Sequence, residues 1–322
     1  MALSRQPDEL IEQARQGSRT ALARLLTMVE RGGSESEAVA SLSYLESPPY
    51  SVGLTGAPGA GKSTLTDRLI TAARTGFPEI DGVAGLENDQ VAVLAIDPSS
   101  PFTGGAILGD RIRMQEHATD PTIFIRSMAT RGHLGGLSLA VPDAIRVLGA
   151  IGMPTVLVET VGVGQMEVEV ASAADTTVVV MNPGWGDAMQ ANKAGLLEIA
   201  DIFVINKADR PGVRETRRDL EQMLDLSNTD DWRPPIVETI AHDGTGLDEM
   251  WATIAQHRAS LIARHELEAR RARRLAEELR RVVAAQLADQ VEKVAGGEAF
   301  NAQVEALVAR RIDPYRAAKA LI

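Results

Sequence analysis

A glycine-rich segment at residues 56–64, GAPGAGKST, has residue types that can hold a phosphate group. It contains G-x-x-x-x-G-K-[ST] in full, after an apolar run typical of a strand and before a helical pattern. In such a loop, backbone N–H groups turn toward phosphate oxygens, and the start of the next helix adds positive potential. Lys62 is expected to reach the β- and γ-phosphates of a nucleotide, and the Ser63 hydroxyl to bind Mg²⁺. The predicted phosphate contacts are Gly56, Ala57, Pro58, Gly59, Ala60, Gly61, Lys62, Ser63 and Thr64.

A second motif, NKAD at Asn206 to Asp209, directly follows the apolar run IFVIN. It is similar to the N-K-x-D element of GTPases, in which the aspartate accepts hydrogen bonds from guanine N1–H and the 2-amino group. Adenine lacks this pair of donors, so ATP would leave a desolvated carboxylate unpaired. A surface turn is the alternative interpretation of the four residues taken alone. The predicted base contacts are Asn206, Lys207 and Asp209, together with the backbone of Ile240, Ala241 and His242.

Acidic residues stand at the ends of two further apolar runs. Asp97 ends VAVLAID, and Glu159 is near the end of TVLVET. Because ligands of open α/β sheets bind outside the carboxyl ends of the strands, we expect both acids beside the glycine-rich loop. There they could hold Mg²⁺ directly or through water. The alternatives are a turn-forming aspartate before Pro98 and, for Glu159, a simple loop acid.

Asp110 is a third candidate Mg²⁺ ligand. It lies in SSPFTGGAILGDRIRMQEH, a segment rich in Gly, Ser and Thr that also has charged residues. This composition suits a loop that reorders around a γ-phosphate. The alternative is a plain connecting loop in which Asp110 pairs with Arg111 or Arg113.

Seven β-branched, apolar runs between residue 50 and residue 240 alternate with helical or loop segments. Such runs are typical of strands buried on both faces of a parallel sheet. They predict an α/β P-loop NTPase domain with a mostly parallel, doubly wound sheet at residues 49–256. An N-terminal helical segment is expected at residues 1–48, and a C-terminal helical segment at residues 257–322. The runs are YSVGLT, VAVLAID, TIFIRS, TVLVET, TTVVVM, IFVIN and IVETI.

The two flanking segments have apolar residues at helical spacing. In the first, the stripe consists of Leu22, Leu25, Leu26 and Val29. In the second, it consists of Leu275, Leu279, Val282, Val283, Leu287, Val291 and Val294, on a helix that Gly296 and Gly297 should end. Asp313 and Pro314 are typical of the cap and first position of a last helix.

The C-terminal segment also includes a basic run, RHELEARRARRLAEELRR, at residues 264–281. Glu266 with Arg270 and Glu277 with Arg281 have i,i+4 spacing, so we interpret the run as a solvated, salt-bridged helix face. Docking on an acidic partner surface is the alternative. Without interleaved aromatic residues, the run is a poor candidate for binding single-stranded nucleic acid.

Composition restricts the function further. The formal net charge is −11, which argues against general affinity for nucleic acid. The chain has no cysteine, which excludes disulfides, iron–sulfur clusters and thiolate zinc sites, and its five histidines are scattered. We found no run of about 20 apolar residues and no apolar stretch typical of a signal peptide near the N-terminus, so we expect a cytoplasmic protein that does not bind membranes.

Taken together, these motifs resemble those of the methylmalonyl-CoA mutase-associated GTPases, also called cobalamin mutase chaperones and once described as arginine/ornithine transport ATPases. The matching blocks span most of residues 50–210, and a last block closes the chain. They are GAPGAGKSTL, AIDPSSPFTGGAILGDRIRM, FIRSMATRGHLGGLS, VETVGVGQMEVEV, MNPGWGDAMQANKAGLLEIADIFVINKAD and DPYRAAKAL.

The resemblance implies a homodimer formed through the C-terminal apolar stripe. It also implies Mg²⁺ linked to Ser63, Asp97, Asp110 and Glu159, and a mobile loop at residues 183–193 that signals to the mutase. Lys62, Glu159 and Asp110 are the expected catalytic residues. Adenosylcobalamin would enter only through the partner, because no part of this sequence is typical of a cobalamin site.

The sequence departs from small GTPases at several positions. Ile240-Ala241-His242 stands where many GTPases have Ser-Ala-Lys, so base contacts there would depend on backbone N–H groups. Glu159 replaces the usual aspartate, and no glutamine occupies the position that orients the attacking water in Ras-like proteins. Gln165 lies too far along the chain for that role to be assumed, so no catalytic base is predicted.

The resulting hypothesis is a GTPase that hydrolyses GTP to GDP and phosphate and gates the loading or protection of methylmalonyl-CoA mutase. One alternative is a nickel-delivering metallochaperone GTPase, which should have clustered Cys or His ligands. Another is a small-molecule P-loop kinase, which should turn over ATP and is disfavoured by NKAD. A module that binds GTP without hydrolysing it is a third.

Overall fold

The computed structural model describes residues 6–87, 89–98, 117, 120–130, 136–160, 173–184, 199–226, 232–295 and 297–321. For residues 97–98, 129–130 and 136–139 it describes the backbone alone. By its internal contacts the chain divides into two units, Met1–Ala272 and Arg273–Ile322. The first unit contains the sheet, and the second is helical.

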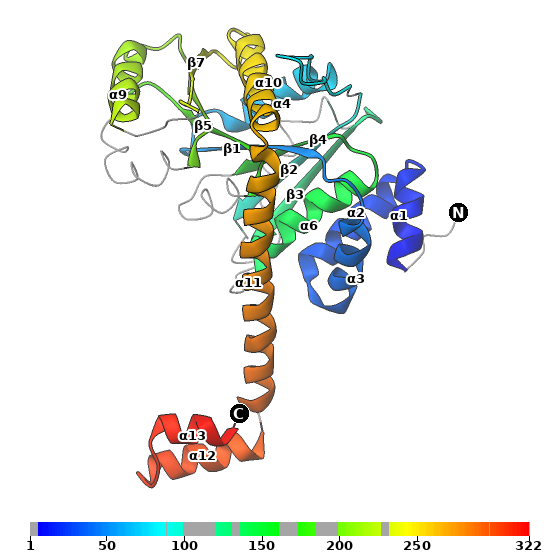
Figure 1. The fold of residues 1–322 in the computed structure, drawn as a ribbon, viewed down its shortest axis with the longest axis vertical. Helices are drawn as coiled ribbons and strands as arrows, with labels where there is room; N and C mark the ends of the chain where they lie inside the picture. The colour runs from blue at the N-terminus through cyan, green and yellow to red at the C-terminus, as the bar shows by residue number, and fades with distance from the viewer. Residues whose placement is uncertain are drawn as a thin grey trace. The chain divides into compact units, whose positions relative to one another are not determined.

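A seven-stranded sheet with the order β3-β2-β4-β1-β5-β6-β7 forms the centre of the first unit (Figure 1). Every pair of neighbouring strands is parallel, which confirms the predicted α/β class. Each of the seven apolar runs forms a strand. The strands are β1 (Tyr50–Gly56), β2 (Val91–Pro98), β3 (Ile123–Thr130), β4 (Thr155–Thr160), β5 (Thr176–Met181), β6 (Ile202–Asn206) and β7 (Ile236–Thr239).

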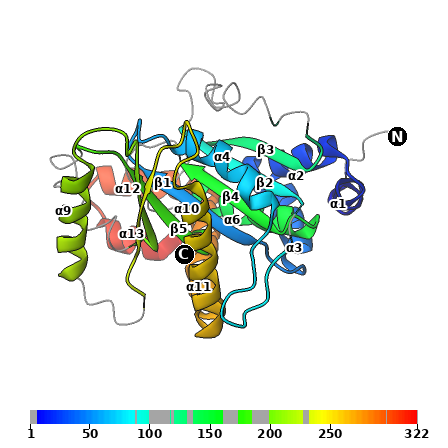
Figure 2. The same ribbon diagram turned by 90° about the horizontal axis from the view of Figure 1, so that it is seen from above.

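Helices cover both faces of this sheet, so both faces of each strand are buried (Figure 2). On one face, α4 (Lys62–Arg74) and α10 (Leu247–Ala263) pack on residues such as Val93 of β2 and Val180 of β5. The other face is covered by α6 (Gly136–Ala150) and α9 (Val213–Asp225). This two-sided burial explains why the strands have continuous β-branched runs instead of alternating polar and apolar residues.

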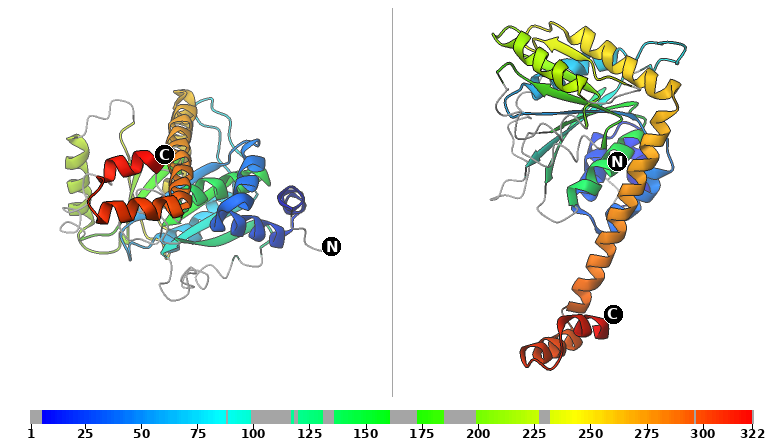
Figure 3. Two further views of the ribbon diagram at one scale, coloured as in Figure 1. Left: turned by 90° about the horizontal axis from the view of Figure 1, so that it is seen from below. Right: turned by 60° about the vertical axis from the view of Figure 1, so that its left-hand side comes forward.

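Three N-terminal helices extend the α6 face of the sheet (Figure 3). They are α1 (Pro7–Arg15), α2 (Arg19–Arg31) and α3 (Gly33–Tyr44). The predicted stripe on α2 is confirmed, because Leu22, Leu25, Leu26 and Val29 are all buried in the core beneath them. A charged contact adds to this packing, since Arg126 of β3 lies 2.7 Å from the carboxylate of Glu30.

The C-terminal helices begin and end where the sequence predicts. Helix α11 (Glu266–Ala295) ends directly before Gly296, and α12 (Glu298–Val308) follows it. Helix α13 (Pro314–Leu321) begins as predicted, because the Asp313 carboxylate accepts hydrogen bonds from the backbone N–H groups of Tyr315 and Arg316, each at 3.0 Å. Figure 1 shows α12 and α13 side by side.

The apolar stripe of α11 is exposed in the single chain. Leu279, Leu287 and Val291 have exposed fractions of 63%, 56% and 62%. No helix within the described ranges is both long enough and apolar enough to cross a membrane.

The predicted pairing of Glu266 with Arg270 is wrong. Glu266 contacts Arg264 at 3.0 Å, whereas Arg270 reaches back to Asp201, 2.7 Å away, at the start of β6. The i,i+4 pattern failed here because the carboxylate of Asp201, which is more buried than that of Glu266, competes for the arginine and attracts it more strongly.

Candidate nucleotide-binding site

The glycine-rich loop leaves β1 and enters α4 as the sequence predicts. Gly56, at the end of β1, has a φ of +130°, and a Cβ built on it would lie 1.9 Å from the carbonyl oxygen of Val180 in β5. Gly61, with a φ of +96°, is the N-cap of α4, and its Cβ would lie 2.3 Å from the side-chain nitrogen of Asn206. Both positions therefore require glycine, for backbone conformation and for space.

Lys62 is the first residue of α4, and its side chain folds over the loop from which it comes. Its Nζ donates hydrogen bonds to the carbonyl oxygens of Gly56, at 2.5 Å, and Ala57, at 3.0 Å. The residue is only 6% exposed. The loop thus holds a positive charge at the point where the backbone N–H groups and the α4 N-terminus also favour an anion.

Asn206 joins the glycine-rich loop to the loop after β7. Its Nδ2 donates to the carbonyl oxygen of Ala60 at 2.8 Å. Its Oδ1 accepts from the Thr239 hydroxyl at 3.2 Å and from the backbone N–H of Ala241 at 3.1 Å. Asn206 is 2% exposed, so one buried amide fixes the phosphate side of the site relative to the side predicted to contact the base.

The next two residues of the NKAD motif extend this link toward solvent. Lys207 has a φ of +61°, and its Nζ donates to the carbonyl oxygen of Gly59 at 2.5 Å. The left-handed backbone turns the chain away from the strand direction directly after Asn206. Asp209, two residues later, is exposed, as a carboxylate that binds a base from solution must be.

The segment after β7 forms a tight loop that contains the three predicted backbone contacts. Ile240 donates to the carbonyl oxygen of Thr245 at 2.9 Å and closes the loop. Ala241 is buried, whereas the side chain of His242 is 72% exposed. From α4, Arg68 donates to the carbonyl oxygen of His242 at 3.1 Å, so the helix that follows the phosphate loop also fastens this segment.

The metal side of the site is described in part. The Ser63 hydroxyl donates to the Glu159 carboxylate at 2.5 Å, at the junction of the α4 N-terminus and the end of β4. Glu159 is 1% exposed. A hydroxyl and a carboxylate are hard oxygen donors, so this pair fits Mg²⁺. The backbone of Asp97 lies at the carboxyl end of β2, but its side chain, like all of Asp110, is outside the described residues.

Two further residues of this site were missed by sequence reasoning. Thr239 is fully buried and positions Asn206, and Arg68 holds the loop after β7. Thr239 ends the IVET run and so stands at the same sheet edge as the other site residues, a signal that could have indicated it. Arg68 has no such signal, because one arginine on an exposed helix face matches no motif.

Gln165 and most of the loop at 183–193 are outside the described residues, so their predicted roles are not tested. Within the described part of the chain, there is no group of three or more His, Asp or Glu residues placed to hold a metal ion.

Comparison with known proteins identifies relatives along nearly the whole chain. A Pyrococcus abyssi protein with a GTPase name is 48% identical over 98% of this chain and 95% of its own length. The GTPase ArgK of Escherichia coli is 38% identical over 85% of this chain and 82% of its own. The mitochondrial methylmalonic aciduria type A homolog of Mus musculus is 35% identical over 69% of this chain and 52% of its own.

A solved structure described as a LAO/AO transport system kinase has the same fold. It covers all of this chain and 98% of its own, with a TM-score of 0.68 and 25% identity. The family model for the methylmalonyl Co-A mutase-associated GTPase MeaB matches residues 22–295. This match includes the glycine-rich loop, the NKAD motif and most of α11. The chain therefore belongs to the MeaB family of methylmalonyl Co-A mutase-associated GTPases and is itself a GTPase.

Proposed function

We propose that this GTPase is a nucleotide-dependent chaperone that gates the loading of adenosylcobalamin onto a methylmalonyl-CoA mutase, or protects the loaded enzyme. The family match over residues 22–295 is the observation that supports this proposal. Hydrolysis would serve as a timer, and the useful output would be a change of shape. Adenosylcobalamin would belong to the partner complex.

On the phosphate side, Lys62 is proposed to turn from the carbonyl groups of Gly56 and Ala57 toward the β- and γ-phosphates. The developing negative charge is then stabilised by an ammonium that the loop already holds in place. Ser63 and Glu159 would hold Mg²⁺, with Asp97 and Asp110 completing the proposed ligand set. When bound, Mg²⁺ would neutralise negative charge on the β- and γ-phosphates.

On the base side, Asp209 is proposed to accept hydrogen bonds from guanine N1–H and the 2-amino group. Its exposure and its place two residues after Lys207 support this role. Lys207 lies over the glycine-rich loop and would cover one face of the base. The backbone of residues 240–242, fastened by Asn206 and Arg68, would line the opposite edge.

Two copies of the chain are proposed to pair through the exposed stripe of α11. Six apolar residues of this stripe are between 38% and 63% exposed: Leu275, Leu279, Val283, Leu287, Val291 and Val294. A contiguous apolar face of this kind is costly to leave in water. Light scattering of the purified protein should give the mass of a dimer, and replacing Leu279 and Leu287 with glutamate should give that of a monomer.

The function is tested by steady-state hydrolysis of GTP and ATP by the purified protein, alone and titrated with a methylmalonyl-CoA mutase. Turnover that prefers GTP and rises as mutase is added is the expected result. Turnover that prefers GTP but ignores the mutase would keep the nucleotide site and remove the mutase from the proposal. Turnover of ATP at the same rate would contradict the base assignment itself.

A further inference from the structure

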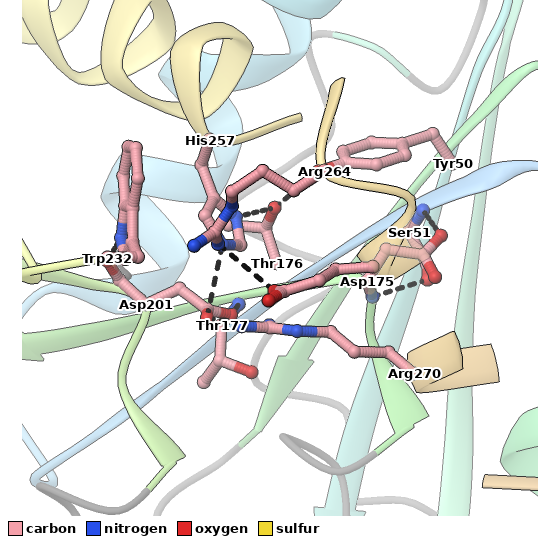
Figure 4. A network of polar contacts seen from close by, with 11 residues as sticks. Tyr50, Ser51, Asp175, Thr176, Thr177, Asp201, Trp232, His257, Arg264 and Arg270 are labelled. Carbon is pink, nitrogen blue, oxygen red and sulfur yellow. Dashed lines mark hydrogen bonds and ion pairs between the residues drawn. The ribbon is translucent and has the colours of Figure 1, made fainter. Parts of the chain in front are cut away.

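A second polar cluster lies at the opposite ends of the strands that form the nucleotide site (Figure 4). It is built on two aspartates, Asp175 directly before β5 and Asp201 directly before β6. Both are buried, with exposed fractions of 1% and 8%. The proposed GTPase mechanism uses neither of them. We refer to the contacts of these two carboxylates as the amino-end network.

The Asp201 half of the network joins three elements. One carboxylate oxygen of Asp201 accepts from the backbone N–H of Thr177 in β5, at 2.8 Å. The other oxygen lies 2.7 Å from Arg270 in the first turns of α11 and 3.2 Å from Nε2 of His257 in α10. His257 is fully buried, and its Nδ1 lies 2.8 Å from the hydroxyl of Thr176. Asp201 therefore links the sheet to both helices.

The Asp175 half joins β1 to α11 in the same way. The Asp175 carboxylate accepts from the backbone N–H of Ser51 at 3.1 Å. Arg271 donates to both oxygens of this carboxylate, at 3.1 Å and 2.9 Å, and also to the carbonyl oxygen of Pro49 at 3.2 Å. Arg270 and Arg271, which are adjacent in α11, therefore form ion pairs with the aspartates that directly precede β6 and β5.

The direction of the hydrogen bonds follows from the charge states. Burial raises the pKa of Tyr50, so its phenol stays protonated and can donate to Thr176, 2.5 Å away. Burial would also raise the pKa of Asp201, but the hydrogen bond and charge of His257 and the charge of Arg270 lower it overall, so Asp201 is an acceptor.

The Thr176, His257 and Asp201 side chains have the order of a nucleophile, a base and an orienting acid. A hydrolytic role is excluded, however, because Thr176 and His257 are both fully buried and a substrate cannot reach the hydroxyl. The arrangement is therefore structural, and its role is to connect the starts of β5 and β6 with α10 and α11.

The three strands in the network, β1, β5 and β6, all reach the nucleotide site with their carboxyl ends or pack directly against it there. β1 begins at Tyr50 and ends at Gly56, and β6 runs from Ile202, beside Asp201, to Asn206. Between them β5 supplies Thr177 at one end and Val180, against Gly56, at the other. Val178, Val179 and Val180 are fully buried, so neighbouring elements enclose the middle of β5.

A buried strand can pass a displacement from one end to the other, because close-packed protein interiors transmit strain. Moving a strand start away from its arginine would separate two largely buried charges. Such a separation is costly, since each charge then lacks the partner that offsets its desolvation. If a strand start moved, the first turns of α11 would have to move with it, or the ion pairs of Arg270 and Arg271 with Asp201 and Asp175 would break.

We propose that the amino-end network couples nucleotide binding to the first turns of α11, with Asp201 and Asp175 acting as positioning residues. The proposal rests on the guanine nucleotide site described above. A nucleotide that displaces Gly56 or Asn206 shifts β1 and β6, and the shift reaches Arg270 and Arg271 at their other ends. Arg270 and Arg271 both lie in the first unit, Met1–Ala272, so the proposed coupling ends at the first turns of α11.

Hydrogen–deuterium exchange of the full-length protein tests the coupling. Backbone amides of residues 264–272 are followed without nucleotide, with GDP, and with a non-hydrolysable GTP analogue. In the wild type we expect their exchange rates to differ by about threefold or more between nucleotide states, because local opening of a helix depends on the contacts that hold it. In Asp201→Asn and Arg270→Gln, which leave only the link between Asp175 and Arg271, we expect this difference to shrink. In the double variant Arg270→Gln/Arg271→Gln, which removes both links, we expect the exchange rate to be the same in all states. Arg270→Gln alters the more exposed partner and so keeps the test available if Asp201→Asn does not fold.

The matched control is Arg217→Gln, which removes an ion pair of 2.6 Å with Glu238 at the β7 edge of the same sheet. This variant should keep the wild-type difference between nucleotide states. Nucleotide affinity is measured separately with a fluorescent GDP, so a failed nucleotide site is distinguished from a failed coupling. Equal exchange in all nucleotide states of a wild type that binds GDP would overturn the proposal. So would a nucleotide-dependent difference that persists undiminished in the double variant Arg270→Gln/Arg271→Gln.

Discussion

The two ends of the central strands are held together by different kinds of chemical group. At the carboxyl ends, the site consists largely of backbone groups, held by glycines, by the Asn206 amide and by two lysines that bond to carbonyl oxygens. At the amino ends, carboxylates, arginines and a histidine are buried together. A binding end has to remain available to a charged ligand, so its two lysines bond to neutral carbonyl oxygens and not to carboxylates. A structural end has to be closed, so its charges neutralise one another.

Removing a carboxylate of the amino-end network should have the largest energetic effect, and it should act on the stability of the fold. Asp175→Ala would leave Arg271 without its carboxylate, and we expect the free energy of unfolding to fall by about 3–5 kcal/mol, as for other broken buried ion pairs. Urea unfolding measures this change. Exposed Asp225→Ala, which removes the contact with Arg233, is the control and should change stability by less than about 1 kcal/mol. Equal losses in the two variants would contradict the contrast between the two ends.

Breaking the binding end should lower affinity by a large factor. Asn206→Ala frees the carbonyl oxygen of Ala60 and the N–H of Ala241 at once, so the two sides of the site are no longer fixed to each other. We expect the affinities for GDP and GTP to fall about 100-fold, or roughly 2.7 kcal/mol. Titration with fluorescent nucleotides gives the affinities. A loss of less than threefold in a folded variant would show that Asn206 does not organise the site.

Exchanging one donor pattern for another should alter specificity at the binding end. Asp209→Asn replaces an acceptor with an amide, which suits the 2-oxo group of xanthosine triphosphate. We expect GTP affinity to fall about 30-fold, or roughly 2 kcal/mol, with a preference for xanthosine triphosphate. Competition between the two nucleotides measures the shift. An unchanged preference would remove Asp209 from base recognition.

The smallest expected effect is at Arg68, which holds the loop after β7 by one exposed hydrogen bond to His242. Arg68→Ala should weaken GDP binding about two- to fivefold, because a single hydrogen bond contributes about 1 kcal/mol. The control is Arg74→Ala on the same helix, where the arginine contacts Asp120 at 2.9 Å instead. Identical effects of the two variants would mean that Arg68 has no particular part in the site.

The binding end was predictable from sequence because its parts are contiguous. The glycine-rich loop and NKAD are short motifs that directly follow apolar runs, and parallel strands bring such ends to one edge. All seven strands follow from the same β-branched runs. The predicted residues that can be followed, from Gly56 to Ser63 and from Asn206 to Asp209, do lie together at that edge.

The amino-end network was not predictable, because its members are far apart in the chain. Asp201 and Arg270 are 69 residues apart, and Asp175 and Arg271 are 96 residues apart. Each looks unremarkable locally, and local helical spacing even assigned Arg270 to Glu266. Only the fold shows that an arginine on a basic helix reaches a buried carboxylate at the start of a strand.

The central claim, a GTPase site at the carboxyl ends of β1, β4 and β6, is tested most directly by initial rates of phosphate release from GTP and ATP. The wild type and Lys62→Ala should be compared at equal nucleotide concentration with Mg²⁺ present. We predict GTP hydrolysis at least about 100-fold faster than ATP hydrolysis, and loss of that activity in Lys62→Ala. Equal rates for the two nucleotides, or full activity in Lys62→Ala, would contradict the account.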